Sequence, residues 1–338
     1  MRIYFLRKEM EKMGHVCEVL NIGQGRRLKG MDFIPVMGGI DYALKVLWFR
    51  MKGFLVHMHL NGDSPKGFIL TLIALVISLV TLKRPVITFH AGPVQVYFPQ
   101  SRAPKLTPLY KIIYRIPRSI ICNNQAVKRT ITSYGIDPDK IFPIPAFSRQ
   151  YLEFTKIDLP PEVEAFFREH RPVIASYVYF RPVFFIESMI LAVSEIVKRK
   201  PNFGLILMGC DKGSEQIQEM IQTLGLKSHV LLAGDQNHDG FLTILTRSEL
   251  YLRTHIKDGV CSSVLEALSL GVPVVACEDG QRPEGVVTYE NENVEDMVNK
   301  IIYVLDNREA ITRSLPHPKI DDTTIPEIRV LEAAYHHA

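Results

Sequence analysis

Residues 253–285, RTHIKDGVCSSVLEALSLGVPVVACEDGQRPEG, decide the fold of this chain. Residues 249–255 predict a short strand that leads into a Lys-Asp-Gly turn. Ser262 and Ser263 then offer N-cap hydroxyls to an apolar-periodic run, Gly271 ends the helix, and the β-branched run behind it predicts the next buried parallel strand. The stretch is therefore one strand–helix–strand unit of an α/β domain.

Two carboxylates bracket the start of this helix, since Asp258 and Glu266 stand eight residues apart. A helix N-terminus at the carboxyl end of a parallel strand presents N–H groups and the positive end of the helix dipole to an anion such as phosphate. Glu266, about one turn inside the helix, can accept hydrogen bonds from the vicinal hydroxyls of a ribose, and Asp258 from those of a second ring. The pattern predicts a site for a nucleotide diphosphate joined to a sugar.

The spacing Asp258-x7-Glu266, followed by Ala-Leu and by GVPVV from Gly271, resembles the E-x7-E signature of retaining GT-B glycosyltransferases of family 4. This chain departs from the signature by having Asp at its first position. The resemblance implies that Glu266 holds the donor ribose, that Asp258 holds the transferred sugar, and that the amides near Ser262 and Ser263 hold the diphosphate. The segment RPEG from residue 282 is similar to the residues found behind the motif in such enzymes, so Arg282 is a donor-side candidate.

Four further residues take roles from the same resemblance. Arg181 would hold the leaving diphosphate, although residues 183–189 lack the lysine that the family often has there. His90, at the end of an expected strand, would border the donor sugar and the acceptor. Gly209 and Gly234 would lie beside the nucleotide base. From the residues alone, a surface arginine, a structural histidine and ordinary strand-end glycines are equally simple interpretations.

The strand around residue 58 carries two histidines at alternate positions, so His57 and His59 are expected to point to the same face. Such a pair can bind a metal, but no third ligand is evident, and the family commonly works without one. We therefore expect no metal and no bound cofactor, with the nucleotide sugar as co-substrate. Asn61, in the loop after the strand, and His59 are expected on the acceptor side.

Composition fits a two-domain globular protein of 338 residues, with 47% apolar and 22% charged residues. Five cysteines, odd in number and without C-x-x-C spacing, favour a reducing compartment without disulfides or zinc. The N-terminal residues are too charged for a signal peptide. We expect a cytoplasmic protein, peripheral on the inner face of the membrane.

Charge is distributed unevenly along the chain. Residues 1–150 hold 22 Lys and Arg against 8 Asp and Glu, a formal charge of +14, whereas the remainder holds 18 against 28, or −10. A basic half suits an anionic membrane face or a lipid-phosphate acceptor, and scattered lysines that confer solubility are the alternative. Nucleic acid is not an expected partner, because the basic residues do not gather in one run.

The longest apolar run, residues 67–82, falls short of the ~20 residues that cross a bilayer. It predicts a buried helix of an α/β domain, and a helix that dips into the membrane surface is the alternative, since the run lies in the basic half.

Alternating strand and helix patterns predict parallel sheets with right-handed crossovers, hence two Rossmann-like, doubly wound domains that face each other across a cleft, the GT-B fold. Residues 1–150 are the expected acceptor-side domain, 151–171 the linker, 172–325 the nucleotide-sugar domain and 326–338 a helix that crosses back. We expect the usual first strand and Gly-rich loop of such a fold to be missing before a helix at residues 2–13. The expected strands are 16–22, 54–60, 86–90, 119–122, 141–146, 173–178, 204–208, 230–233, 249–255 and 272–276.

The sequence thus predicts a retaining glycosyltransferase. It would move a sugar from a nucleotide-diphosphate donor to a glycan or lipid-linked acceptor in cell-envelope polysaccharide biosynthesis. The alternative is a catalytically silent GT-B homologue that binds nucleotide or a protein partner. A nucleotide-sugar epimerase or a phosphorylase on the same fold is a third interpretation, although no sequence context supports the pyridoxal lysine of a phosphorylase.

Overall fold

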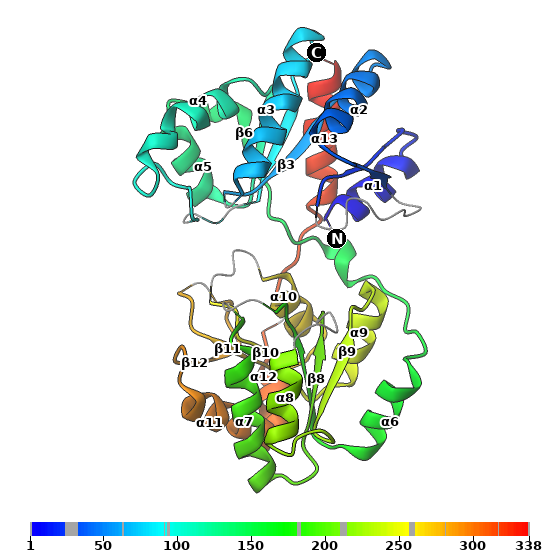
Figure 1. Cartoon of the computed structure of the whole chain (residues 1–338), viewed down its shortest axis with the longest axis vertical. Coiled ribbons are helices and arrows are strands. Elements are labelled where there is room, and N and C mark those ends of the chain that lie inside the picture. The colour runs from blue at the N-terminus through cyan, green and yellow to red at the C-terminus, as the bar shows by residue number, and fades with distance from the viewer. Residues whose placement is uncertain are drawn as a thin grey trace. The chain divides into compact units, whose positions relative to one another are not determined.

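The computed structural model describes residues 2–23, 33–62, 64–90, 92, 95–180, 184–209, 215–256, 261–280, 282–316 and 318–336. The chain divides into two compact units (Figure 1). Unit 1 comprises residues 1–150 and 320–338, and unit 2 comprises residues 151–319. Residues 320–325, expected in the second domain, therefore belong with unit 1.

Within the described ranges, no helix combines the length and the apolar character that crossing a membrane requires.

Unit 2 is built on a six-stranded sheet of order β12-β11-β10-β7-β8-β9, in which all neighbours pair in parallel. On one side of β7 lie β8 and then β9, in the order of the chain. The chain then crosses to the other side of β7, where β10, β11 and β12 follow one another outward. This reversal lies between β7 and β10, where open α/β sheets bind ligands at the carboxyl ends of their strands. The strands are β7 Val173–Tyr177, β8 Gly204–Met208, β9 Val230–Gly234, β10 Leu250–Arg253, β11 Val274–Cys277 and β12 Val286–Tyr289.

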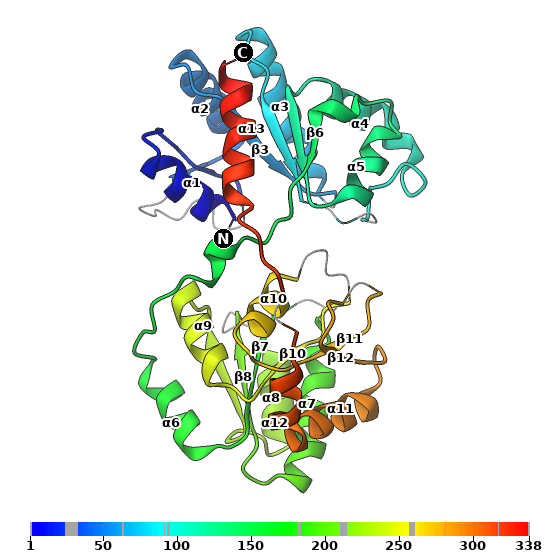
Figure 2. The same cartoon turned by 180° about the vertical axis from the view of Figure 1, so that it is seen from behind.

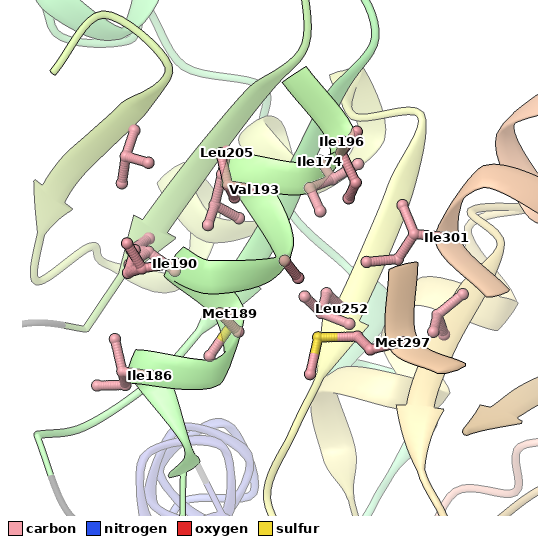
Figure 3. Packing of buried hydrophobic residues seen from close by; sticks show 14 of the residues in the cluster. Ile174, Ile186, Met189, Ile190, Val193, Ile196, Leu205, Leu252, Met297 and Ile301 are labelled. Carbon is pink, nitrogen blue, oxygen red and sulfur yellow. The ribbon is translucent and has the colours of Figure 1, made fainter. Parts of the chain in front are cut away.

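Helices cover both faces of this sheet, because alternate residues of its strands enter two separate cores. One core joins Ile174, Leu205 and Leu252 to helices α7, α8 and α11. Figure 3 shows how the α7 side chains, Met189 among them, meet those strand residues and Met297 of α11. The other core joins the alternate strand residues to α6, α9 and α10. The helices are α6 Pro161–Glu169, α7 Ile186–Arg199, α8 Glu215–Thr223, α9 His238–Arg247, α10 Ser262–Ser269, α11 Val294–Asp306 and α12 Arg308–Ser314.

The segment expected to be a linker contains a helix of unit 2. Helix α6 begins at Pro161, a residue suited to the first helical position, and buries Val163 and Phe166 in the second core. Helices α9 and α12 and strand β12 are further elements that the sequence patterns did not predict.

Unit 1 holds a four-stranded parallel sheet of order β3-β4-β5-β6 and a separate parallel pair, β1-β2. The strand expected at residues 16–22 is two residues long and pairs with a segment that was not predicted. The strands are β1 Leu20–Asn21, β2 Ile34–Pro35, β3 His57–Leu60, β4 Val86–Phe89, β5 Ser119–Cys122 and β6 Ile141–Pro143. The helices are α1 Arg2–Lys12, α2 Gly39–Met51, α3 Pro65–Val80, α4 Thr107–Arg115, α5 Gln125–Thr132 and α13 Thr324–His336. Short 3-10 turns occupy Pro104–Leu106, Pro138–Lys140 and Arg149–Leu152.

Helix α13 returns to unit 1 and lies along the four-stranded sheet beside α1, as Figure 2 shows. Its Ile328 and Leu331 pack with Leu6 of α1 and with Val86 of β4. A buried ion pair fixes this arrangement, since Arg2 Nε donates to Glu327 Oε2 at 2.8 Å and both side chains are less than a tenth exposed.

We expect Glu327→Gln to lower the free energy of unfolding of unit 1 by about 3–5 kcal/mol, because Arg2 would stay buried without its counter-charge. Urea unfolding followed by the fluorescence of Trp48, the only tryptophan of the chain, measures the loss.

The matched control is Glu332→Gln on the same helix. Its carboxylate lies 2.9 Å from His15 Nε2, but both side chains are partly exposed, so the cost should stay below about 1 kcal/mol. Equal losses in the two variants would contradict a special role for the buried pair.

Candidate functional site

The candidate donor site lies at the carboxyl edge of the unit 2 sheet, where α10 begins after β10. Glu266 sits one turn inside α10, as the sequence predicted, and is 4% exposed. Its Oε1 lies 2.9 Å from Nε2 of His238, the first residue of α9. The carboxylate therefore points across the edge of the sheet toward the element that follows β9.

The start of α10 differs from the expectation in its capping. The N-cap residue is Cys261, which makes no side-chain capping hydrogen bond, and Ser262 is the first helical residue. Ser263 does not cap either, because its hydroxyl accepts a hydrogen bond from the Tyr251 hydroxyl at 2.8 Å. A helix that begins without a side-chain cap leaves its first amides to other acceptors, phosphate oxygens among them.

Gly209 and Gly234 end neighbouring strands and are joined by a hydrogen bond from Gly209 N to Gly234 O at 2.8 Å. Both have φ near +70°, where residues with a Cβ are strained. At Gly209 a Cβ would also lie 2.8 Å from both the Tyr177 ring and the Val178 carbonyl. The glycine thus lets β8 pass close beside the end of β7.

Tyr177 and Asp235 are polar groups at this edge that the sequence patterns did not single out. The Tyr177 hydroxyl lies 3.1 Å from that of Tyr179 and donates to Asp235 Oδ1 at 3.4 Å. Burial, and then Tyr179 and Asp235, raise the pKa of Tyr177 above its usual range, so it stays a neutral hydrogen-bonding group.

Arg282 is buried and its observed partners are protein groups. Its guanidinium donates to the carbonyls of Cys277 and His255, each at 2.8 Å, and lies 3.3 Å from Asp279 Oδ2. These contacts hold the ends of β10 and β11 together, and a donor contact by Arg282 stays a prediction. The other two donor-side candidates, Asp258 and Arg181, lie outside the described residues.

Unit 1 brings its predicted histidines together on one face of the sheet. His59 Nδ1 lies 2.6 Å from His90 Nε2 with the rings stacked, and the rings of His57 and His59 are 4.4 Å apart. His57 Nε2 lies 2.7 Å from Thr88 Oγ1, which donates to Glu327 at 3.5 Å. The prediction that His57 and His59 share a face is confirmed.

Asn61 follows β3 and is exposed. Across the described parts of both units, no three His, Cys, Asp or Glu side chains are grouped so that they could hold a metal ion.

His57, His59 and His90, which we call the histidine row, are held in the neutral form. Burial, and then the charges of Arg2 and His90, lower the pKa of His57 to about 3. Burial and Arg2 lower that of His90 to about 4, and burial followed by the neighbouring histidines lowers that of His59 well below its usual range. One ring nitrogen of the His59–His90 contact therefore donates a proton that the other accepts.

Two parallel-sheet units of the Rossmann type, with a helix start and a buried carboxylate at the carboxyl edge of one, agree with a GT-B fold. Residues 163–314, which lie in unit 2, match the family model described as "Glycosyl transferases group 1". Unit 2 is therefore similar to the glycosyltransferases of group 1, and this similarity supports an enzyme of that class.

Two curated proteins match parts of the chain. A phosphatidylinositol N-acetylglucosaminyltransferase subunit of Arabidopsis thaliana is 22% identical over 192 residues, which cover 55% of this chain and 41% of that protein. An uncharacterized glycosyltransferase of Methanocaldococcus jannaschii is 30% identical over 96 residues, which cover 28% of this chain and 23% of that protein. The chain thus spans less than half the length of these relatives in the matched regions.

Solved structures match over most of the chain. A glycosyltransferase from Rickettsia africae gives a TM-score of 0.70 at 15% identity, covering 100% of this chain and 95% of that one. Anabaena HepE in complex with UDP-glucose gives 0.65 at 16%, covering 90% and 85%. A putative UDP-N-acetylglucosamine 2-epimerase from Listeria monocytogenes gives 0.62 at 16%, covering 91% and 84%. At these identities the likeness establishes the fold, and the GT-B prediction is confirmed.

We expect Gly209→Ala to destabilise unit 2 by about 3 kcal/mol, since a positive φ and a clash with the end of β7 add together. Gly234→Ala is the matched control, because it has the same φ strain but nothing within 4 Å of the new Cβ, and should cost only about 1–2 kcal/mol. Urea unfolding followed by far-UV circular dichroism compares the two, and an equal cost would contradict the close approach at Gly209.

Unit 1 should lose stability as the pH falls below about 6.5. Its unfolded histidines titrate near 6.5, whereas the folded ones stay neutral to about pH 4, so the unfolded state binds more protons between these values. Each buried histidine then contributes up to about 1.4 kcal/mol of lost stability per pH unit.

Urea unfolding of unit 1, followed by Trp48 fluorescence between about pH 7 and pH 5, measures this slope. His57→Gln should flatten it, whereas His336→Gln, which replaces an exposed histidine near the end of α13, should leave it unchanged. A slope unaffected by His57→Gln would show that the buried row is not its source.

Proposed function

We propose that this chain is a retaining glycosyltransferase of the family 4 type, in which unit 2 binds a nucleotide-diphosphate sugar and unit 1 serves the acceptor. The observation that carries the proposal is the placement of Glu266. Its buried carboxylate stands one turn inside a helix that starts at the strand-order reversal of unit 2, within the residues that match the group 1 family. A carboxylate in that position suits the two hydroxyls of a ribose, and the helix start suits the diphosphate.

The remaining donor-side roles follow from the same edge of the sheet. The strand-end glycines leave room for a base beside Gly209 and Gly234, and Asp258 would hold the hydroxyls of the transferred sugar. Arg181 would stabilise the departing diphosphate together with the amides of Ser262 and Ser263. Because HepE was solved with UDP-glucose, UDP-sugars are the first donors to test.

On the acceptor side, His90 would border the transferred sugar, with His59 and Asn61 near the acceptor. In the transfer itself, the bond between the anomeric carbon and the diphosphate oxygen breaks while a bond to the acceptor oxygen forms on the same face. The departing diphosphate takes the proton that the acceptor hydroxyl loses, so no enzymic nucleophile is required. The acceptor is a glycan or a lipid-linked intermediate of cell-envelope polysaccharide synthesis.

Transfer or hydrolysis with a panel of UDP-, GDP- and ADP-sugars tests the proposal. Glu266→Ala should weaken nucleotide binding by about 10- to 100-fold, the value of a charge-assisted hydrogen bond to the ribose, and transfer should fall with it. Calorimetric titration with UDP reads binding separately from turnover.

The matched control is Glu309→Ala in α12, whose exposed carboxylate pairs only at the surface with Arg313. Nucleotide binding that survives Glu266→Ala would contradict the ribose role. Tight UDP binding without any transfer across the panel would favour the catalytically silent homologue, and interconversion of UDP-sugars without an acceptor would favour an epimerase.

A further inference from the structure

Helix α2 presents an apolar stripe to solvent on the outside of unit 1. Ile40, Leu44, Trp48 and Met51 follow one another at intervals of three or four residues, so they share one face of the helix. Trp48 is 50% exposed and Met51 77%. The opposite face buries Val46 against α3, so the exposed stripe takes no part in the core.

Helix α3 lacks the polar outer face that a surface helix normally shows. Its buried face includes Thr71 and Ser78, which are fully inaccessible, whereas Ile69, Val76 and Val80 are exposed. Thr71 can be buried because its hydroxyl donates to the Gly67 carbonyl one turn earlier. An apolar outer face on a surface helix suits an apolar partner.

The two stripes lie on neighbouring helices. Helices α2 and α3 pack through Val46 and Ala74. Arg50 of α2 donates from Nε to Thr81 Oγ1 at 2.9 Å, which joins their C-terminal ends. Just beyond, Leu82 is 89% exposed at a φ of +56°, a conformation that a leucine seldom adopts. We call this surface the α2–α3 face.

The segment that carries the α2–α3 face is rich in positive charge. Residues 36–85 contain six Lys and Arg but only two Asp and Glu. One of the two acids, Asp41, is paired with Lys45 at 2.7 Å. Lys52 lies with its Nζ 3.7 Å from the centre of the Trp48 ring, and Lys66 and Arg84 are exposed at the ends of α3.

These charges distinguish between two possible occupants. A second copy of the face would bring like charges together, which costs free energy, whereas an anionic bilayer offers phosphates to the cations and an acyl boundary to the apolar stripe. Tryptophan and lysine side by side are typical of residues that settle at the headgroup level of a membrane.

We propose that the α2–α3 face docks unit 1 on an anionic lipid surface, with Trp48, Met51, Val80 and Leu82 at the boundary between headgroups and acyl chains. The helices lie on the bilayer and do not cross it. This docking would give the proposed glycosyltransferase a reason to use a lipid-linked acceptor. Its test measures lipid binding and not sugar transfer, so the docking proposal and the proposed function can fail independently.

Flotation with vesicles of phosphatidylcholine, with and without phosphatidylglycerol, tests the docking. We expect the full chain to float with the anionic vesicles only, and to be released by high salt. Since Trp48 is the only tryptophan, its emission should shift to shorter wavelength on binding and be quenched by brominated acyl chains. Absence of binding to anionic vesicles, or binding without any change at Trp48, would overturn the proposal.

Charge insertions locate the surface. Met51→Glu and Val80→Glu should each reduce vesicle binding at least about tenfold, because an acidic side chain at this depth opposes both the apolar and the electrostatic attraction. Lys52→Gln and Lys66→Gln should each reduce it about fivefold. The controls are Leu191→Glu in α7 and Tyr303→Glu in α11, which replace exposed apolar residues of unit 2; these variants should bind as the unchanged protein does.

Circular dichroism and urea unfolding establish that every variant is folded, as expected for exposed positions. Binding lost equally in the unit 2 controls would overturn the proposal. A dimer in sedimentation velocity that dissociates in Met51→Glu, together with no vesicle binding by the unchanged chain, would also overturn it and assign the face to a second copy.

Discussion

The buried ion pair between Arg2 and Glu327 is the constraint on which unit 1 depends. It fixes α13 beside α1 over one face of the sheet, and that face carries His57, Thr88 and the other polar residues of the histidine row. Burial raises the pKa of Glu327 even though Arg2 opposes the shift, so desolvation offsets much of the attraction. The pair therefore fixes the position of α13 more than it raises the net free energy of unfolding. The charge of Arg2 also helps burial to lower the pKa values of the histidines and so keeps them neutral.

Regular, strongly patterned segments of the fold could be predicted from the sequence. Strands β5 and β8 have the predicted bounds, because each is a short apolar run buried on both faces. Helix α9 escaped prediction because Gly240 interrupts its first turn, although Asn237 caps it by accepting from the Gly240 amide. Helix α6 was taken for a linker because two prolines precede it, yet proline is favoured at a helix start. Local breakers thus concealed elements that tertiary packing stabilises.

Part of the candidate donor site could likewise be predicted from the sequence, and part could not. The position of Glu266 one turn inside α10 follows from local sequence, but its partner His238 lies 28 residues away on α9, the helix that the patterns missed. Ser263 does not cap the helix for a related reason, because its hydroxyl accepts a hydrogen bond from Tyr251 of the preceding strand. Arg282 was chosen by motif, and only the fold reveals that it holds two strand ends. Motif spacing predicts where a residue stands, whereas its partners depend on elements distant in sequence.

Composition alone could not predict whether helix α3 is buried in a core or lies in a membrane surface. Residues 67–82 are apolar on every side, so periodicity could not distinguish a core helix from one that lies in a membrane surface. One face of the helix packs on the sheet, as the core interpretation predicts, and the other is exposed, so contact of that face with a membrane stays a proposal. The informative residues are the few polar ones, Thr71 and Ser78, which point inward. The exposed apolar side chains of this helix and the excess of basic residues in the same segment are the features that the proposed anionic lipid partner would satisfy.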